Sequence, residues 1–228
     1  MAIAFVSTAN SGGGVAVTSQ TITPSITSGN TVVLSVMIQT TTVSSVTSSP
    51  SQTWTRKRQV IPGGANPNFE LWTAPLSSLA VTSITINYVA STDACAIADE
   101  YSGVVAFGTT AQNSGSAGTL TVSLTTQDAN NWIAGGVTVD SNTITTTTGI
   151  ERANVAPFGG AGSVNGAAGD NTAASPSSIS LAWSMTGSLS NAAAVIELRS
   201  ATGADTLAFD DAAVGPITII TSGNWVVS

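Results

Sequence analysis

Short runs in which apolar and polar residues alternate recur along the chain, about every 10 to 15 residues. The runs are rich in Val, Ile and Thr, and turn signals such as Ser28-Gly29-Asn30, Pro62-Gly63-Gly64 and Asp140-Ser141-Asn142 separate them. No window shows an apolar stripe at the helical period of about 3.6 residues. The pattern predicts an all-β protein, built as an antiparallel β-sandwich or jelly roll.

The predicted strands cover residues 15–22, 31–40, 53–61, 68–74, 83–90, 94–102, 119–125, 132–139, 142–150, 178–185 and 192–198. The run from Thr31 to Ile38 is apolar on both faces, which predicts a central strand that is covered on both sides. The glycine-rich stretch 159–169 predicts a long surface loop.

Two segments are expected: a sandwich over residues 1–200 and a C-terminal β-hairpin or arm over residues 201–228. The arm is too short to form its own core. It nevertheless carries large apolar side chains, which we expect to pack on a neighbouring subunit. Those chosen as candidate partner-binding residues are Phe209, Ile217, Ile219 and Trp225.

Composition excludes several classes of function. The chain of 228 residues has no His and a single Cys, so it cannot use a Ser-His-Asp triad, a Cys-His pair or most zinc, copper and iron sites. Its net charge is −7 with five basic residues, which argues against nucleic acid as a partner. No run is long enough for a membrane span, and no signal peptide precedes the first strands. We expect no enzyme activity, no cofactor and no metal.

Carboxylates and oxygen-rich turns do not form a recognisable motif. Asp99 and Glu100 are adjacent, so on a strand they point to opposite faces and cannot act together. The turns that begin at Asp128, Asp140 and Asp170 lack EF-hand spacing. We therefore expect a structural role rather than a catalytic one, in which one buried carboxylate is bonded to backbone N–H groups or to an Arg.

One pair of predicted strands gathers chemically distinctive side chains. At a period of two, Trp54, Arg56 and Arg58 share one face, and Glu70 and Trp72 share a face of the next strand. Three interpretations stay open: a core Trp with a cross-strand Arg–Glu pair, a protein interface, or a platform on which a sugar stacks.

The order of certain turns and strands resembles a β-sandwich module of bacteriophage virion proteins, of the head-decoration, head-fibre or tail-fibre type. The residues that carry the resemblance are Ser28-Gly29-Asn30-Thr31-Val32-Val33, Gln52-Thr53-Trp54-Thr55-Arg56, Glu70-Leu71-Trp72-Thr73-Ala74, Ala98-Asp99-Glu100-Tyr101-Ser102-Gly103 and Ala192-Ala193-Ala194-Val195-Ile196-Glu197-Leu198. The resemblance covers about residues 3–199 and brings no catalytic motif.

The resemblance implies a non-enzymatic structural protein of the virion, made in the host cytoplasm. Its expected partners are other copies of itself, for example in a trimer, and other virion proteins such as the major capsid or tail protein. The alternative is a carbohydrate-binding or adhesin module that uses Trp54 and Trp72 as stacking platforms and binds a host surface glycan.

Overall fold

The computed structural model describes residues 1–63, 67–75, 80–140, 142–155, 164–186 and 190–201. Within these ranges the chain forms fourteen strands, pairs them only in antiparallel fashion and contains no helix, so the predicted all-β class is confirmed. This described part also holds no helix with the length and hydrophobicity that crossing a bilayer requires. The predicted C-terminal arm falls almost entirely outside the described residues.

The first half of the chain supplies six strands. They are β1 (Ala4–Ile22), β2 (Thr31–Ile38), β3 (Val43–Ser49), β4 (Thr55–Val60), β5 (Asn68–Pro75) and β6 (Ser83–Ser102). They form one sheet in the order β1-β6-β2-β5-β4, and β3 pairs with the first part of β6. Because β1 and β6 are long, they pass from the five-stranded part into a three-stranded part that contains β3.

The second half supplies eight shorter strands. They are β7 (Val104–Gly115), β8 (Thr119–Thr125), β9 (Trp132–Asp140), β10 (Ile144–Thr148), β11 (Ile150–Val155), β12 (Val164–Thr172), β13 (Ser178–Met185) and β14 (Asn191–Ser200). One sheet has the order β11-β12-β9-β14-β7 and the other the order β10-β13-β8.

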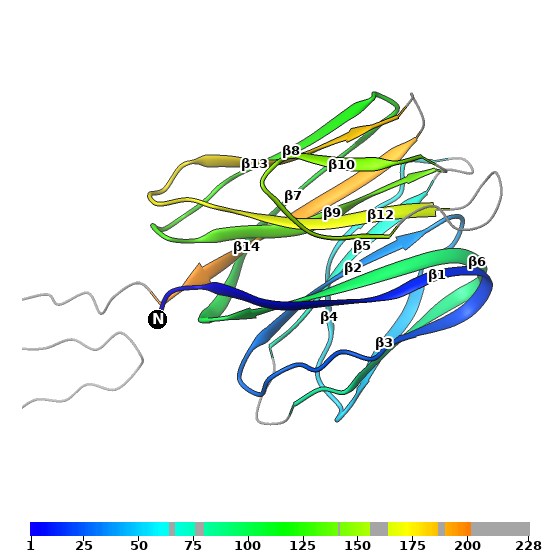
Figure 1. Cartoon of the computed structure of the whole chain (residues 1–228), viewed down its shortest axis with the longest axis horizontal. Coiled ribbons are helices and arrows are strands. Elements are labelled where there is room, and N and C mark those ends of the chain that lie inside the picture. Colours follow the sequence, from blue (N-terminus) through cyan, green and yellow to red (C-terminus); the bar gives the residue numbers. More distant parts are fainter. Residues whose placement is uncertain (64–66, 76–79, 141, 156–163, 187–189, 202–228) are drawn as a thin grey trace, which may run out of the picture.

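The two halves have the same topology. The order β1-β6-β2-β5-β4 corresponds, strand by strand, to β7-β14-β9-β12-β11, and the β1-β6-β3 part corresponds to β8-β13-β10. The segment 1–200, which the sequence predicted as one sandwich, therefore consists of two sandwich repeats stacked on each other (Figure 1).

A pseudo-twofold axis relates the repeats. At the centre of the interface, β2 faces its own equivalent, β9. The other contacts come in equivalent pairs: β1 faces β11 as β7 faces β4, and β6 faces β12 as β14 faces β5. Ser35 and Gly136 each lie five residues after an equivalent Asn, and a Cβ placed on Gly136 would lie 2.9 Å from Ser35 Oγ. Equivalent residues thus meet at the centre of the interface, as in an isologous dimer.

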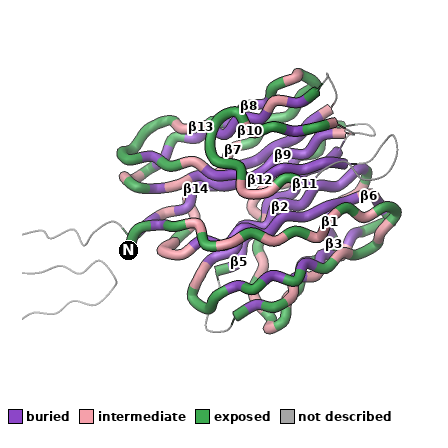
Figure 2. Tube along the Cα trace, in the orientation of Figure 1, coloured by how far each residue is buried: buried purple, intermediate pink, exposed green. Residues whose placement is uncertain are grey.

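Three apolar clusters fill the layers. One lies within each sandwich, and the third lies between the two five-stranded sheets. All eight residues of β2 are buried, as the apolar faces of Thr31–Ile38 predicted. Figure 2 shows the consequence: the inner strands are buried along most of their length, whereas exposed residues concentrate on the outer layers and turns.

The prediction of a surface loop over the glycine-rich stretch 159–169 is wrong for its second half. Residues 164–169 belong to β12, a central strand that pairs with β9 and β11. Its glycines reflect packing: a Cβ on Gly166 would lie 2.6 Å from the Met37 side chain, and one on Gly169 would lie 2.7 Å from the Ile150 carbonyl oxygen. Small residues are required there because neighbouring strands approach closely.

Candidate functional site

The structure brings Trp72, Arg56 and Glu70 together on neighbouring strands β4 and β5. The Arg56 guanidinium lies 5.7 Å from the centre of the Trp72 ring. Its Nη1 is 3.5 Å from Glu70 Oε2, and Trp72 Nε1 donates a hydrogen bond of 3.0 Å to the same oxygen. The cation covers the indole, and the indole N–H is already bonded.

Two residues of the predicted patch lie elsewhere. Trp54 precedes β4, packs against the core of the first sandwich and donates a hydrogen bond of 3.2 Å from Nε1 to Ser48 Oγ. Arg58 does not share the face of Arg56, which corrects the sequence analysis. A β-bulge at Lys57 shifts the register, so that Arg58 lies opposite Leu71 and points to the interface between the sheets.

Glu70 has a structural role. Its side chain is fully buried, and Oε1 accepts hydrogen bonds from the Val43 N–H at 2.9 Å and from Gln59 Nε2 at 3.0 Å. Together with the bond from Trp72, these contacts tie β3, β4 and β5 to one carboxylate. Of the three interpretations of the patch, the geometry favours a Trp that packs on the core beside an Arg–Glu pair. The remaining candidates, Phe209, Ile217, Ile219 and Trp225, lie outside the described residues.

Glu100 closes the turn that precedes β2. Its Oε1 accepts hydrogen bonds from the Thr27 N–H at 2.8 Å and from Asn30 Nδ2 at 2.6 Å, and its Oε2 accepts one of 2.6 Å from Ser7 Oγ. The carboxylate therefore joins its own strand, β6, to two segments that are far apart in the sequence: β1 at Ser7 and the turn that contains Thr27 and Asn30.

Glu197 repeats this arrangement in the second sandwich. Its Oε1 accepts hydrogen bonds from the Gln127 N–H at 2.6 Å and from Asn131 Nδ2 at 2.7 Å. Glu197 lies opposite Ile133 on β9, just as Glu100 lies opposite Val32 on β2. The sequence analysis missed this pair, although an Asn before each buried central strand and a Glu near the end of each repeat could have indicated it.

A second missed cluster lies between the two five-stranded sheets. Arg152 donates to both oxygens of Asp170, at 2.6 and 2.9 Å, and the Tyr101 hydroxyl donates to Asp170 Oδ2 at 3.0 Å. The Arg152 guanidinium also lies 4.0 Å from the centre of the Phe5 ring. Burial raises the pKa of Tyr101 well above its usual value, so this hydroxyl acts as a donor. The cluster links the two repeats.

Two pairs of described carboxylates, Asp99 with Glu100 and Glu70 with Glu100, lack the geometry of a glycosidase pair. Asp99 and Glu100 point to opposite faces of β6, as expected for adjacent strand residues. Glu70 and Glu100 lie opposite Val36 and Val32 of β2, four residues apart and so about 13 Å along the strand. That separation exceeds the roughly 5–10 Å that glycoside hydrolysis requires.

Two of the oxygen-rich turns that were considered as calcium sites have other roles in the fold. Asp128 accepts a hydrogen bond of 3.0 Å from Arg199 Nε. Asp170, predicted in a turn, lies in β12. Across the described ranges, no group of three or more Asp, Glu, Cys or His residues could hold a metal ion. Cys95 is buried among apolar residues, and burial raises its pKa to about 12.

No family model matches this chain, and neither a curated protein nor a solved structure matches it.

Proposed function

We propose that this chain is a non-enzymatic structural protein of a bacteriophage virion, a capsid-decoration or fibre component that acts through protein–protein contacts. The observation that carries the proposal is the use of the buried carboxylates. Glu70, Glu100, Asp170 and Glu197 all accept hydrogen bonds that join separate strands or repeats. These four carboxylates hold separate strands in fixed positions, which suits a mechanical role.

Two further features support the proposal. The turn and strand pattern over about residues 3–199 resembles virion modules. Charged residues make up 7% of the chain, so little electrostatic repulsion opposes association between copies. The partners we propose are other copies of the chain, in a trimer or another cyclic assembly, and the major capsid or tail protein. Residues 201–228 form the assembly segment of this proposal, because they carry Phe209, Ile217, Ile219 and Trp225.

Sedimentation velocity of the full chain at micromolar concentration tests the proposal. We expect an oligomer, and we expect the protein to co-sediment with purified phage particles. A second sample, truncated after Thr202, should keep the far-ultraviolet circular dichroism of a β protein and lose assembly. A full chain that sediments as a monomer and does not bind particles would contradict the proposal.

The predicted alternative, a sugar platform on Trp54 and Trp72, has less support. Both indole N–H groups already donate to protein oxygens, and Arg56 lies over the Trp72 ring. Stacking of a sugar requires an open aromatic face, which here would first require Arg56 to move.

A further inference from the structure

The pseudo-twofold symmetry places two equivalent grooves on the molecule. The first, here called the Trp132 groove, is lined by Ala2, Ile3, Asn130, Trp132, Thr172, Ala173 and Ala174. The second, the Thr31 groove, is lined by Thr31, Pro75, Val104, Val105, Ala106 and Phe107. Trp132 pairs with Thr172 across the strands, as Thr31 pairs with Pro75, so these residues occupy equivalent positions. The volumes are about 280 and 130 Å³.

Three equivalent positions give the Trp132 groove its aromatic and polar groups. It has Trp132 where the other has Thr31, and Thr172 where the other has Pro75. The turn before the central strand has Asn130 in place of Gly29, and both residues adopt a positive φ, of 59° and 82°. The Trp132 groove thus has an indole and an amide that its counterpart lacks, beside the hydroxyl of Thr172, and all three groups line it.

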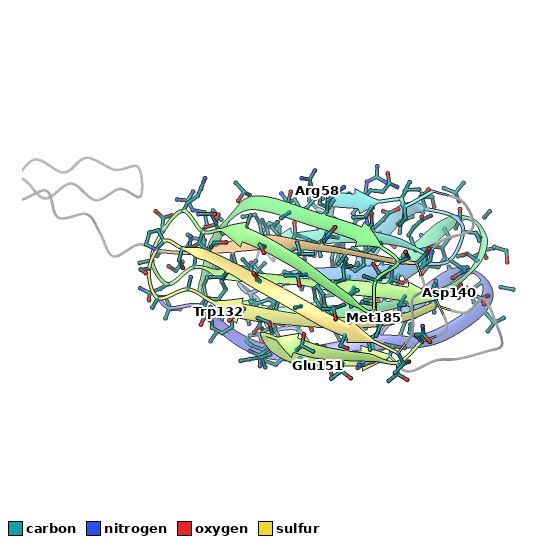
Figure 3. The ribbon with its side chains drawn as sticks, turned by 90° about the horizontal axis from the view of Figure 1, so that it is seen from above. Arg58, Trp132, Asp140, Glu151 and Met185 are labelled. Atoms are coloured by element: carbon teal, nitrogen blue, oxygen red, sulfur yellow. The ribbon has the colours of Figure 1, made fainter. Side chains whose placement is uncertain are left out.

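The indole is held in a fixed position. Trp132 is half-buried against the core between the sheets, where its ring meets Tyr101 edge-on at a centroid distance of 6.2 Å. Tyr101 is in turn fixed by its hydrogen bond to Asp170. Figure 3 shows Trp132 toward one end of the molecule and Asp140 toward the other. A rigid aromatic side chain at a groove wall loses little entropy when a ligand stacks on it.

The chemistry of the lining selects the ligand. Among the residues that the structure describes, no charged side chain lines the groove, so neither an anion nor a cation finds a counter-charge in this lining. An aromatic ring stacks on the apolar C–H face of a sugar, and an amide and a hydroxyl both donate to and accept from its hydroxyl groups. A volume of about 280 Å³ lies just below the range of roughly 300–1,000 Å³ that larger ligands occupy. It suits one ring.

We propose that the Trp132 groove binds a single neutral pyranose ring of a glycan. This site is separate from the Trp54 and Trp72 residues of the predicted platform, and it goes beyond the proposed structural function. A protein that assembles on a particle can carry such a groove, and so can one that does not, so the two proposals are tested independently.

A glycan array probed with the full chain, followed by calorimetric titration with free D-glucose, D-galactose, D-mannose and N-acetyl-D-glucosamine, tests the proposal. We expect binding to at least one neutral glycan and to its monosaccharide. Trp132→Thr, which installs the residue of the other groove, should weaken binding by about tenfold or more. Val105→Ala, in the Thr31 groove, is the control; Val105 is 63% exposed, so this variant should fold and bind normally.

A second variant covers the case in which Trp132→Thr does not fold. Asn130→Gly copies Gly29 at a position with positive φ, where glycine is well tolerated, and it should also weaken binding. The proposal is overturned if no neutral glycan binds, or if only charged glycans or apolar peptides bind. It is also overturned if Asn130→Gly and Trp132→Thr bind like the natural chain, or if Val105→Ala abolishes binding.

Discussion

Replacing Asp99 by Asn should remove a large pH-dependent contribution to stability. Asp99 is 1% exposed, lies on the interface side of β6, and its Oδ1 has no hydrogen-bond partner. Burial raises its pKa from 3.8 to about 7. The Thr8 hydroxyl lowers the pKa, the nearby Asp170 charge raises it, and Arg152 lowers it, but burial has the largest effect.

The direction of the effect follows from proton binding. Between the unfolded pKa of 3.8 and the folded pKa of about 7, the native protein binds more protons at Asp99 than the unfolded chain does. The free energy of unfolding therefore falls as the pH rises through this window and levels off above it. At about 1.4 kcal/mol for each pH unit, the loss reaches about 4 kcal/mol over the window.

Urea unfolding at a series of pH values from 4 to 8 measures this contribution. The natural chain, Asp99→Asn and the control Asp93→Asn are compared; Asp93 lies on the same strand and is partly exposed. The natural chain should lose stability relative to Asp99→Asn as the pH rises, by several kcal/mol in total, while Asp93→Asn follows the natural chain. A difference between the natural chain and Asp99→Asn that stays within about 1 kcal/mol at every pH would refute the reasoning.

Three further predictions concern stability and accessibility. Glu100→Gln and Glu197→Gln should each lower the free energy of unfolding, measured with urea, by about 2–4 kcal/mol, because each removes the charge from hydrogen bonds to a buried carboxylate. A loss of stability in only one of the two variants would contradict the equivalence of the two sites. Gly135→Ala should lower the unfolding free energy by about 2 kcal/mol or more, because its Cβ would overlap the backbone of a neighbouring strand. Gly115→Ala, with no atom closer than 3.9 Å, should change it by about 0.5 kcal/mol at most, and equal effects in a thermal melt would contradict this. Cys95 should react with an aromatic disulfide reagent only after unfolding, since its thiol is buried and its pKa is about 12; rapid labelling of the native chain would count against the fold.

The sequence predicted the strands whose pattern arises from one buried face. Residues 119–125 and 178–185 match β8 and β13, because alternation of Thr or Ser with Leu, Val or Trp reflects one core face and one exposed face. The predicted strands at 83–90 and 94–102 are one continuous strand, β6, which passes from the three-stranded part of its sheet to the five-stranded part. Alternation cannot show such continuity, since the same residues suit a strand that stops or one that bends.

The remaining misses have tertiary causes. Strand β12 reads as a loop because Gly and Ala dominate it, and only the closely packed neighbouring strands explain why larger residues do not fit. The predicted face shared by Arg56 and Arg58 assumed an unbroken period of two, which the bulge at Lys57 interrupts. The Trp132 groove depends on residues from the segment before β1, the start of β9 and the end of β12, which only the folded chain brings together.

The pairing of two sandwiches through one covalent chain has a consequence for dilution. In a homodimer of single sandwiches, the interface that contains Ser35 and Gly136 would dissociate as the concentration falls. Here the second sandwich follows the first after Gly103, so the partner is always present at a high effective concentration. Dilution of the protein into a large volume would therefore leave this interface intact. The fusion also lets each half change without imposing the same change on the other, which is how one groove can carry Trp132 while its counterpart keeps Thr31.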